Sequence, residues 1–317
     1  GDRLGALIAA FQAVTRAQKD GSWLDEASTP PELLGPVVQA IERVRLGRRE
    51  LLLDAYADLR ARHGNDALLR MDRALAGYLK DQDVGPTHPR QRPLFMHFPD
   101  IPSPAYHDPG LQPWAARLRS AFVDIRREAL ALIQQDVEAL PHFVGAMTSE
   151  ARAKYVSGLS ANPAWQAFFF YRRGKRYADN HARCPVTSEV LDSLDLCRIP
   201  AQAPEICFSV LRPQSQINAH HGVSNIRLVM HLPLIVPPDC ALNLVDAGTH
   251  HWREGELVMF DDTYLHEAWN RSDKTRVILL MDCWNPYLTA VERQACAQLI
   301  DRVSRLKNPD SQGTGYE

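Results

Sequence analysis

The sequence has no stretch of about 18 consecutive apolar residues, the length that a membrane-spanning helix needs. Its 36 Lys and Arg residues nearly balance its 38 Asp and Glu residues, which leaves a formal net charge of −2. Proteins that bind nucleic acid or an anionic membrane surface through charge usually carry an excess of positive charge. The sequence therefore predicts neither a membrane span nor a nucleic-acid partner.

The sequence also lacks any C-x-x-C pair. Its six cysteines occur singly, at Cys184, Cys197, Cys207, Cys240, Cys283 and Cys296. This spacing argues against a zinc knuckle and against a disulfide-dense secreted scaffold, and free thiols indicate a cytoplasmic protein. The chain begins at Gly1 without a methionine, so removal of a targeting segment that preceded it stays an open alternative.

The 317 residues, 45% of them hydrophobic and 23% charged, are typical of a globular protein with more than one region. Apolar residues recur at helical spacing over 1–82, which predicts a helical region, either a small bundle or degenerate helical repeats. Such a region is available to bind a protein partner. The proline-rich segment 83–113 cannot form a continuous helix, and we expect an ordered linker that crosses the next domain.

The remainder, 114–307, combines helices with short strands. Helical spacing over 114–133 predicts a long helix that backs a sheet, and 289–306 predicts a closing helix. Between them, short strands separated by turn residues are typical of a jelly-roll barrel. We therefore predict an α+β fold in which an N-terminal helical region precedes a barrel with supporting helices, followed by a polar tail at 308–317.

One predicted strand, 224–234, has an unusual distribution of polar residues. Strand alternation places Ile226, Leu228, Met230 and Leu232 on one face and Asn225, Arg227, Val229 and His231 on the other. Three polar residues out of four are not a core pattern. The second face is predicted to line a functional cavity.

Two histidines and one arginine suggest the chemistry of that cavity. His220 and His266 fall on separate predicted strands, and Arg276 follows. Imidazole suits Fe(II), and a non-haem iron oxygenase keeps metal positions open for cosubstrate and oxygen. The arginine fork can hold a dicarboxylate through two hydrogen bonds. A lone histidine near an apolar strand is more often structural, so spacing alone leaves that alternative open.

The residues around this trio resemble the aspartyl/asparaginyl β-hydroxylase family in order and spacing. The resemblance covers about 165–286 and is strongest over 218–232, 252–262, 266–270 and 282–286. It implies a double-stranded β-helix, the cupin-like barrel, which holds Fe(II) and 2-oxoglutarate at its mouth and uses O2. It also implies a hydroxylase.

The same resemblance implies roles for individual residues. The two histidines match the iron ligands, and Arg276 matches the arginine that pairs with the distal carboxylate of 2-oxoglutarate, helped by Ser209. His231 matches a histidine that contacts the cosubstrate near the metal. Trp165 opens a segment similar to the one that closes over the cosubstrate.

Two positions carry information about ligands and substrate. Gly222 stands where the general facial triad has a carboxylate, and the family characteristically lacks that carboxylate. Val229 stands where the human-type enzyme has a second arginine. Arg227 is then the single cation on this face of the strand, and we expect it to bind a carboxylate or carboxamide of the substrate.

Three functions stay open. The first is hydroxylation of an Asp or Asn residue in a peptide or protein. The second is the same chemistry on a free amino acid, a natural-product intermediate or a lipid acyl chain, which the loss of the second arginine keeps in play. The third is a non-catalytic metal-binding sensor or scaffold. Arg276 and Ser209 argue against the third, because a scaffold needs no clamp for a cosubstrate carboxylate.

Overall fold

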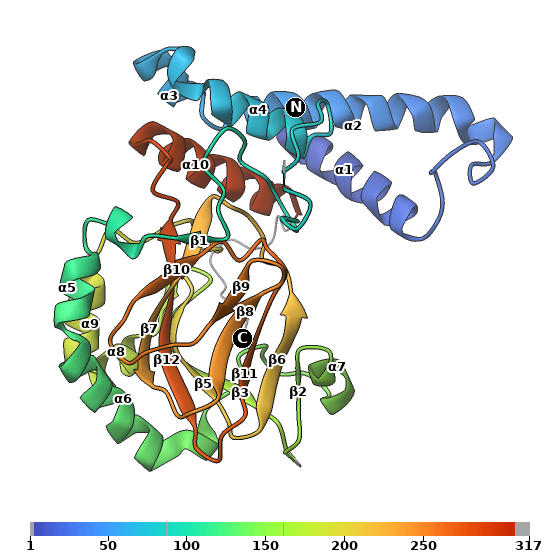
Figure 1. The fold of residues 1–317 in the computed structure, drawn as a ribbon. Coiled ribbons are helices and arrows are strands. Elements are labelled where there is room, and N and C mark those ends of the chain that lie inside the picture. Colours follow the sequence, from blue (N-terminus) through green and yellow to red (C-terminus); the bar gives the residue numbers. More distant parts are fainter. Residues whose placement is uncertain (1–2, 87, 161, 308–317) are drawn as a thin grey trace.

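The computed structural model describes residues 3–86, 88–160 and 162–307, and it shows a β-barrel with helices on one face and a helical region at one end (Figure 1). The helices are α1 (Arg3–Lys19), α2 (Leu34–Asp54), α3 (Ala57–His63), α4 (Leu69–Tyr78), α5 (Ala115–Ser120), α6 (Phe122–Asp136), α7 (Ser149–Ala153), α8 (Ala178–Arg183), α9 (Pro185–Asp192) and α10 (Ala290–Lys307). The strands are β1 (Tyr106–His107), β2 (Val156–Gly158), β3 (Trp165–Arg172), β4 (Lys175–Arg176), β5 (Ile206–Leu211), β6 (Ser215–His220), β7 (Arg227–Ile235), β8 (Cys240–Leu244), β9 (Gly248–His250), β10 (Val258–Phe260), β11 (His266–Asn270) and β12 (Arg276–Trp284). The predicted tail, 308–317, lies outside the described residues.

The barrel consists of two antiparallel sheets that face each other. One sheet has the order β1-β10-β7-β12-β5-β3-β4 and the other β2-β6-β11-β8-β9. A single cluster of buried side chains takes Ile217 and Leu242 from the smaller sheet and Leu211 and Phe260 from the larger one. Two facing antiparallel sheets with a shared core are typical of jelly-roll barrels, the group to which the double-stranded β-helix belongs. The predicted α+β fold with a cupin-like barrel is confirmed.

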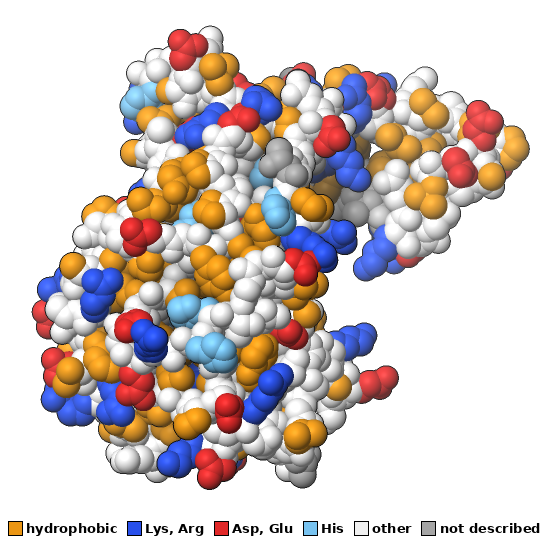
Figure 2. All heavy atoms as spheres, in the orientation of Figure 1, with side chains coloured by type: hydrophobic (Ala, Val, Ile, Leu, Met, Phe, Trp, Pro, Cys, Tyr) orange, Lys and Arg blue, Asp and Glu red, His pale blue; other side chains and the backbone are white. Residues whose placement is uncertain are grey.

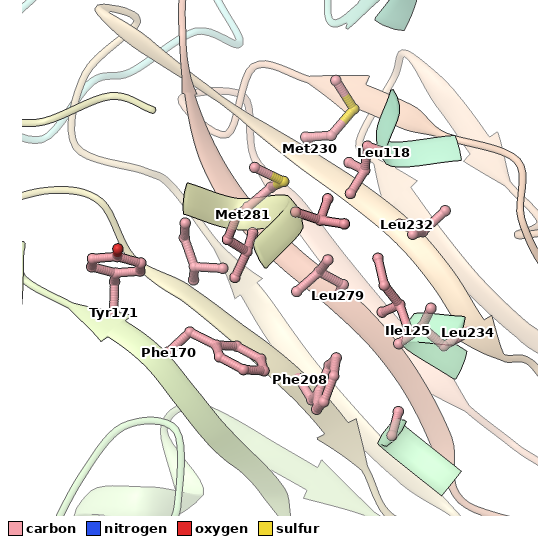
Figure 3. Packing of buried hydrophobic residues seen from close by; sticks show 14 of the residues in the cluster. Leu118, Ile125, Phe170, Tyr171, Phe208, Met230, Leu232, Leu234, Leu279 and Met281 are labelled. Carbon is pink, nitrogen blue, oxygen red and sulfur yellow. The ribbon is translucent and has the colours of Figure 1, made fainter. Parts of the chain in front are cut away.

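Helices cover the outer face of the larger sheet. Leu118 of α5 and Ile125 of α6 pack into one cluster with Leu232 of β7 and Leu279 of β12 (Figure 3). The single helix expected over 114–133 is interrupted at Ala121, whose ψ of 0° departs from the helical value. Both halves nevertheless back the sheet as predicted.

Strand β7 separates its two faces by alternation. Its apolar side chains pack under the helices, whereas Arg227, Val229 and His231 line a cavity between the sheets, as the sequence predicted. Asn225 is the exception, because it precedes β7. Its amide group exchanges hydrogen bonds of 2.7 and 2.8 Å with the backbone of Phe98, so it fixes the incoming segment and does not line the cavity.

The proline-rich segment is more than a linker. The backbone N–H of Arg92 donates to Thr263 (2.8 Å) and that of Leu94 donates to Gly222 (3.0 Å), which fastens the segment beside the barrel mouth. Its two-residue strand β1 then extends the larger sheet by pairing with β10. Two residues are too few for alternation to reveal, which is why the sequence did not predict this strand.

The N-terminal helices rest on the last helix of the chain. Leu59 and Met71 join Cys296 and Leu299 of α10 in one buried cluster, while α1 and much of α2 project beyond the barrel (Figure 1). The face shown in Figure 2 carries acidic and basic side chains intermixed over both parts. None of the helices that the structure describes has the length and apolar character that crossing a bilayer requires.

Glu292 couples the two regions. Arg70 of α4 donates to its two carboxylate oxygens from Nε (2.8 Å) and Nη2 (2.6 Å). The same carboxylate accepts from the backbone N–H of Thr289 (2.8 Å), and Oγ1 of Thr289 accepts from the N–H of Glu292 (3.2 Å). This reciprocal pair is a capping box at the start of α10. Glu292 is only 3% exposed, so its charge depends on Arg70.

We expect Arg70→Met to lower the free energy of unfolding by about 1–3 kcal/mol, because it leaves the buried carboxylate of Glu292 without its charged donor. The measurement is urea denaturation. Arg73→Met is the matched control, since Arg73 pairs with Asp100 where both side chains are exposed, and its effect should stay within about 0.5 kcal/mol. Equal losses in the two variants would show that burial of Glu292 is not what matters.

Candidate functional site

A cavity of about 190 Å³ lies between the two sheets. The smaller sheet contributes two of the predicted site residues and the larger sheet the others. The cavity is lined, among other residues, by His220, His266, Trp165, Ser209, Arg227, His231 and Arg276. The structure thus brings all the predicted site residues together, although they are far apart in the sequence.

The two histidines occupy directly opposed positions on adjacent strands. His220 on β6 and His266 on β11 are register partners, and their ring centroids are 4.2 Å apart. Nδ1 of His220 donates to the carbonyl of Asn218 (2.8 Å), and Nδ1 of His266 donates to that of Tyr264 (2.9 Å). This fixes both tautomers with the lone pair on Nε2, as in metal-ligating histidines.

Burial keeps both rings neutral. Desolvation lowers the pKa of His220, and desolvation together with repulsion from His220 lowers the pKa of His266 to about 3. The ordinary pKa of histidine is about 6.5, so lowering it in both residues favours the neutral ring, with no proton on the second nitrogen, at physiological pH. Both imidazoles therefore offer a lone pair to a cation, which is the state a metal ligand requires.

The described residues provide no third protein ligand. No group of three or more His, Cys, Asp or Glu side chains in the described part of the chain is placed to hold a metal ion. Gly222 stands where a facial triad has its carboxylate, and a side chain there would have no room, because a Cβ atom on Gly222 would overlap the carboxyl group of Asp262. His221 turns away, and its Nδ1 bonds the carbonyl of Thr263 (2.9 Å).

Arg276 is a fully buried cation that lacks an anionic partner. Its side chain has no exposure, its Nη1 reaches the carbonyl and the hydroxyl of Ser209 at 3.4 Å, and its Nε and Nη2 donate to nothing in the described chain. Burial lowers its pKa to about 10, so it stays charged. A buried guanidinium with two free donors is costly unless an anion completes it. A carboxylate of a bound molecule fits this requirement.

Three neighbours shape the surroundings of Arg276. Nε1 of Trp165 donates to Oγ of Ser209 (2.9 Å), and the indole stacks on Phe143 with centroids 3.8 Å apart. His231 lies edge-on to Phe260, and neither ring nitrogen has a partner in the described chain. Burial holds the pKa of His231 well below its usual value. Its neutral ring is free to donate to a ligand in the cavity.

Arg227 is already engaged. Its Nη1 donates to Oδ1 of Asp282, and its Nη2 lies 3.7 Å from Oδ2 of Asp262. We expected this guanidinium to meet the substrate directly. The structure instead surrounds it with carboxylates, so an anionic substrate group would have to compete with them.

Sequence inspection missed Glu205 and Asp282 as cavity residues. Both line the cavity, and both were within reach of strand alternation. Asp282 has the same parity as Arg276 along β12, and Glu205 has the same parity as Ser209 just before β5. Extending the alternation argument beyond β7 would have found them.

Comparison with known proteins agrees with this geometry. The sequence profile of the aspartyl/asparaginyl β-hydroxylase family matches residues 119–286. The ornithine lipid ester-linked acyl 2-hydroxylase of Rhizobium tropici is 34% identical over 61% of this chain and 65% of its own length. The aspartate β-hydroxylase domain-containing protein 2 of Mus musculus is 30% identical over 65% of this chain and 58% of its own. The human aspartyl/asparaginyl β-hydroxylase is 30% identical over 41% and 17%. The chain thus matches less than two thirds of the length of each of these relatives.

We expect the protein to bind one divalent ion, and His220→Ala and His266→Ala should each weaken Mn(II) binding by at least about tenfold, because either change removes a ligand. Titration calorimetry measures this. His221→Ala is the control, since that ring is bonded to Thr263 and should leave the affinity unchanged. Loss of binding in all three variants, or in none, would contradict the assignment.

Gly222→Ala should lower the free energy of unfolding by about 1–3 kcal/mol, because the new methyl group would have to displace the buried carboxyl group of Asp262. Combining it with Asp262→Gly should cost less than the sum of the two changes, as expected for residues in contact. Gly35→Ala serves as control, since a Cβ there meets nothing within 4 Å. Full additivity in denaturation experiments would show that the two positions do not compete for space.

Proposed function

The chain belongs to the aspartyl/asparaginyl β-hydroxylase family, and from this premise we propose that it is a hydroxylase that depends on Fe(II), 2-oxoglutarate and O2. The observation that carries the proposal is Arg276, a buried cation without an anion, placed in the same cavity as two neutral histidines. A metal-binding scaffold would leave this guanidinium uncompensated. A dicarboxylate that also reaches the metal would complete it.

The residues of the chain divide the work. Iron with 2-oxoglutarate and O2 supplies the oxidation that replaces a C–H bond by C–OH while the cosubstrate becomes succinate and carbon dioxide. His220 and His266 would hold the metal. Arg276 and Ser209 would hold the distal carboxylate, and Trp165 orients the Ser209 hydroxyl through its indole N–H. His231, uncharged and lacking a partner, would donate to the cosubstrate near the metal.

Two substrate classes are candidates for this hydroxylase. Members of the family give the first candidate, an aspartyl or asparaginyl residue in a peptide. The second candidate, a lipid acyl chain, is favoured by the activity for which the relative from Rhizobium tropici is named and by apolar side chains in the cavity, among them Val229, Ile278 and Leu280. The pairing of Arg227 with Asp282 counts against an aspartyl carboxylate, because the other guanidinium among the described residues that line the cavity, Arg276, would be occupied by the cosubstrate.

The deciding experiment is incubation with Fe(II), ascorbate and 2-oxoglutarate in air, with succinate as the readout. Asparaginyl and aspartyl peptides and acylated amino lipids would be compared, and the oxidised product identified by mass spectrometry. Succinate that depends on both metal and one substrate class supports the proposal and selects that class. If none of the candidate substrates gives metal-dependent succinate, the proposed function is wrong.

Arg276→Lys should weaken 2-oxoglutarate binding by about tenfold or more, because lysine keeps the charge but loses the two-pronged donor. Calorimetric titration of 2-oxoglutarate into the Mn(II)-loaded protein measures the change without turnover. Arg253→Lys is the control, because Arg253 is exposed and pairs only with Glu256 at 3.8 Å. An unchanged affinity in Arg276→Lys would remove Arg276 from the cosubstrate site.

A further inference from the structure

One end of the cavity is rich in carboxylates. Glu205, Asp262 and Asp282 all line it, and they surround the single guanidinium of Arg227; these four residues are called the acidic pocket below. Among the described residues that line the cavity, the other cation is Arg276, which stands beside Ser209. The acidic pocket therefore combines three acids with one base, and its charge is unbalanced.

Asp282 alone is enough to neutralise Arg227. Its Oδ1 accepts from Nη1 of Arg227, and its Oδ2 accepts from the backbone N–H of Glu205 at 2.8 Å. Both oxygens of this buried carboxylate thus have donors. Because both of its oxygens already accept hydrogen bonds, Asp282 has no strong acceptor left for a ligand. The remaining two acids decide what the pocket binds.

Asp262 presents a free acceptor. The residue is only 7% exposed, its Oδ1 has no hydrogen-bond partner in the described chain, and its Oδ2 lies 3.7 Å from Nη2 of Arg227, beyond hydrogen-bond length. Its carboxyl group stands in the space beside Gly222 and lines the cavity. An unpaired acceptor at this depth is costly unless a ligand supplies a donor.

Glu205 adds a second free acceptor. Within the described chain its carboxylate accepts no hydrogen bond and forms no ion pair, while its backbone N–H is used by Asp282. Burial and the nearby charge of Asp282 raise the pKa of Glu205 to about 7. The positive charges of Arg227, Arg172 and Arg173 lower this pKa, but by less. Glu205 is partly exposed at the cavity, so its carboxylate is accessible to a ligand.

We propose that the acidic pocket binds a cationic nitrogen group of the substrate, an ammonium or a guanidinium, with Asp262 and Glu205 as its acceptors. Such a group supplies both the hydrogen-bond donors and the positive charge that these two acids lack. This inference rests on the proposed function and names the polar group that its substrate carries. It replaces the carboxylate or carboxamide that the sequence led us to expect opposite Arg227.

Charge counting separates the two alternatives. At a pH above the pKa of about 7 of Glu205, a substrate carboxylate would bring a fourth anion to one guanidinium that Asp282 already pairs, and like charges in a poorly solvated site repel strongly. A carboxamide would offer donors but no charge. A cation satisfies both acceptors and restores the balance, so affinity should rank amine, then amide, then acid.

The test uses three probes that differ only in their polar end: hexylamine, hexanamide and hexanoate. Each is titrated at mildly alkaline pH into protein loaded with Mn(II) and 2-oxoglutarate, and binding is measured by calorimetry. We expect hexylamine to bind at least about tenfold more tightly than hexanoate, with hexanamide between them. Glu205→Gln and, independently, Asp262→Asn should each weaken hexylamine binding by about fivefold while changing hexanamide little.

Glu256→Gln is the matched control, because Glu256 is exposed and outside the cavity, so it removes one negative charge without touching the pocket. It should leave all three affinities unchanged. Melting temperatures confirm that each variant is folded. Hexanoate binding as tightly as hexylamine, no binding of any probe to the loaded protein, or equal effects of Glu205→Gln and Glu256→Gln would overturn the assignment. Failure of Mn(II) and 2-oxoglutarate to load would instead defeat the proposed function.

Discussion

A buried arginine without a counterion is the constraint around which the site is arranged. Arg276 sits at the start of β12, at the core between the sheets, where solvation cannot stabilise its charge. Within the described chain, its hydrogen-bond acceptors are the two oxygens of Ser209, at 3.4 Å, and its guanidinium lies over the Trp252 ring, 5.1 Å from the ring centroid. The protein thus carries an incomplete ion pair in its interior, and a ligand carboxylate is needed to complete it. Trp165, which stacks on Phe143, donates to the Ser209 hydroxyl beside that position.

The barrel makes such a site possible by dividing the tasks between its sheets. The smaller sheet holds the two histidines in register, and Nδ1 of each donates to the carbonyl of the residue two positions earlier in the chain. The larger sheet supplies the charged and polar groups. Because the outer face of that sheet is sealed by α5, α6 and α9, its strands hold their positions, and the inward side chains are fixed with them.

Much of this could be read from the sequence, and the limits have physical causes. Strand alternation correctly assigned Arg227, Val229 and His231 to the cavity. Alternation identifies a face but not a partner, so it could not show that Arg227 is held by Asp282 across neighbouring strands. Nor could it show that Asp262 fills the space beside Gly222, because both residues lie outside the strands: Gly222 follows β6, and Asp262 lies in the turn before β11.

The contact between Gly222 and Asp262 has a consequence for how sequences of this kind can change. A single substitution that gave position 222 a carboxylate would meet the carboxyl group of Asp262 before it reached the metal site. Loss of Asp262 first would remove a group that the cavity is built around. The route to a third protein ligand thus requires two substitutions, of which either alone is harmful. Sterics alone therefore oppose a one-step change from the two-histidine arrangement to one with a carboxylate at position 222.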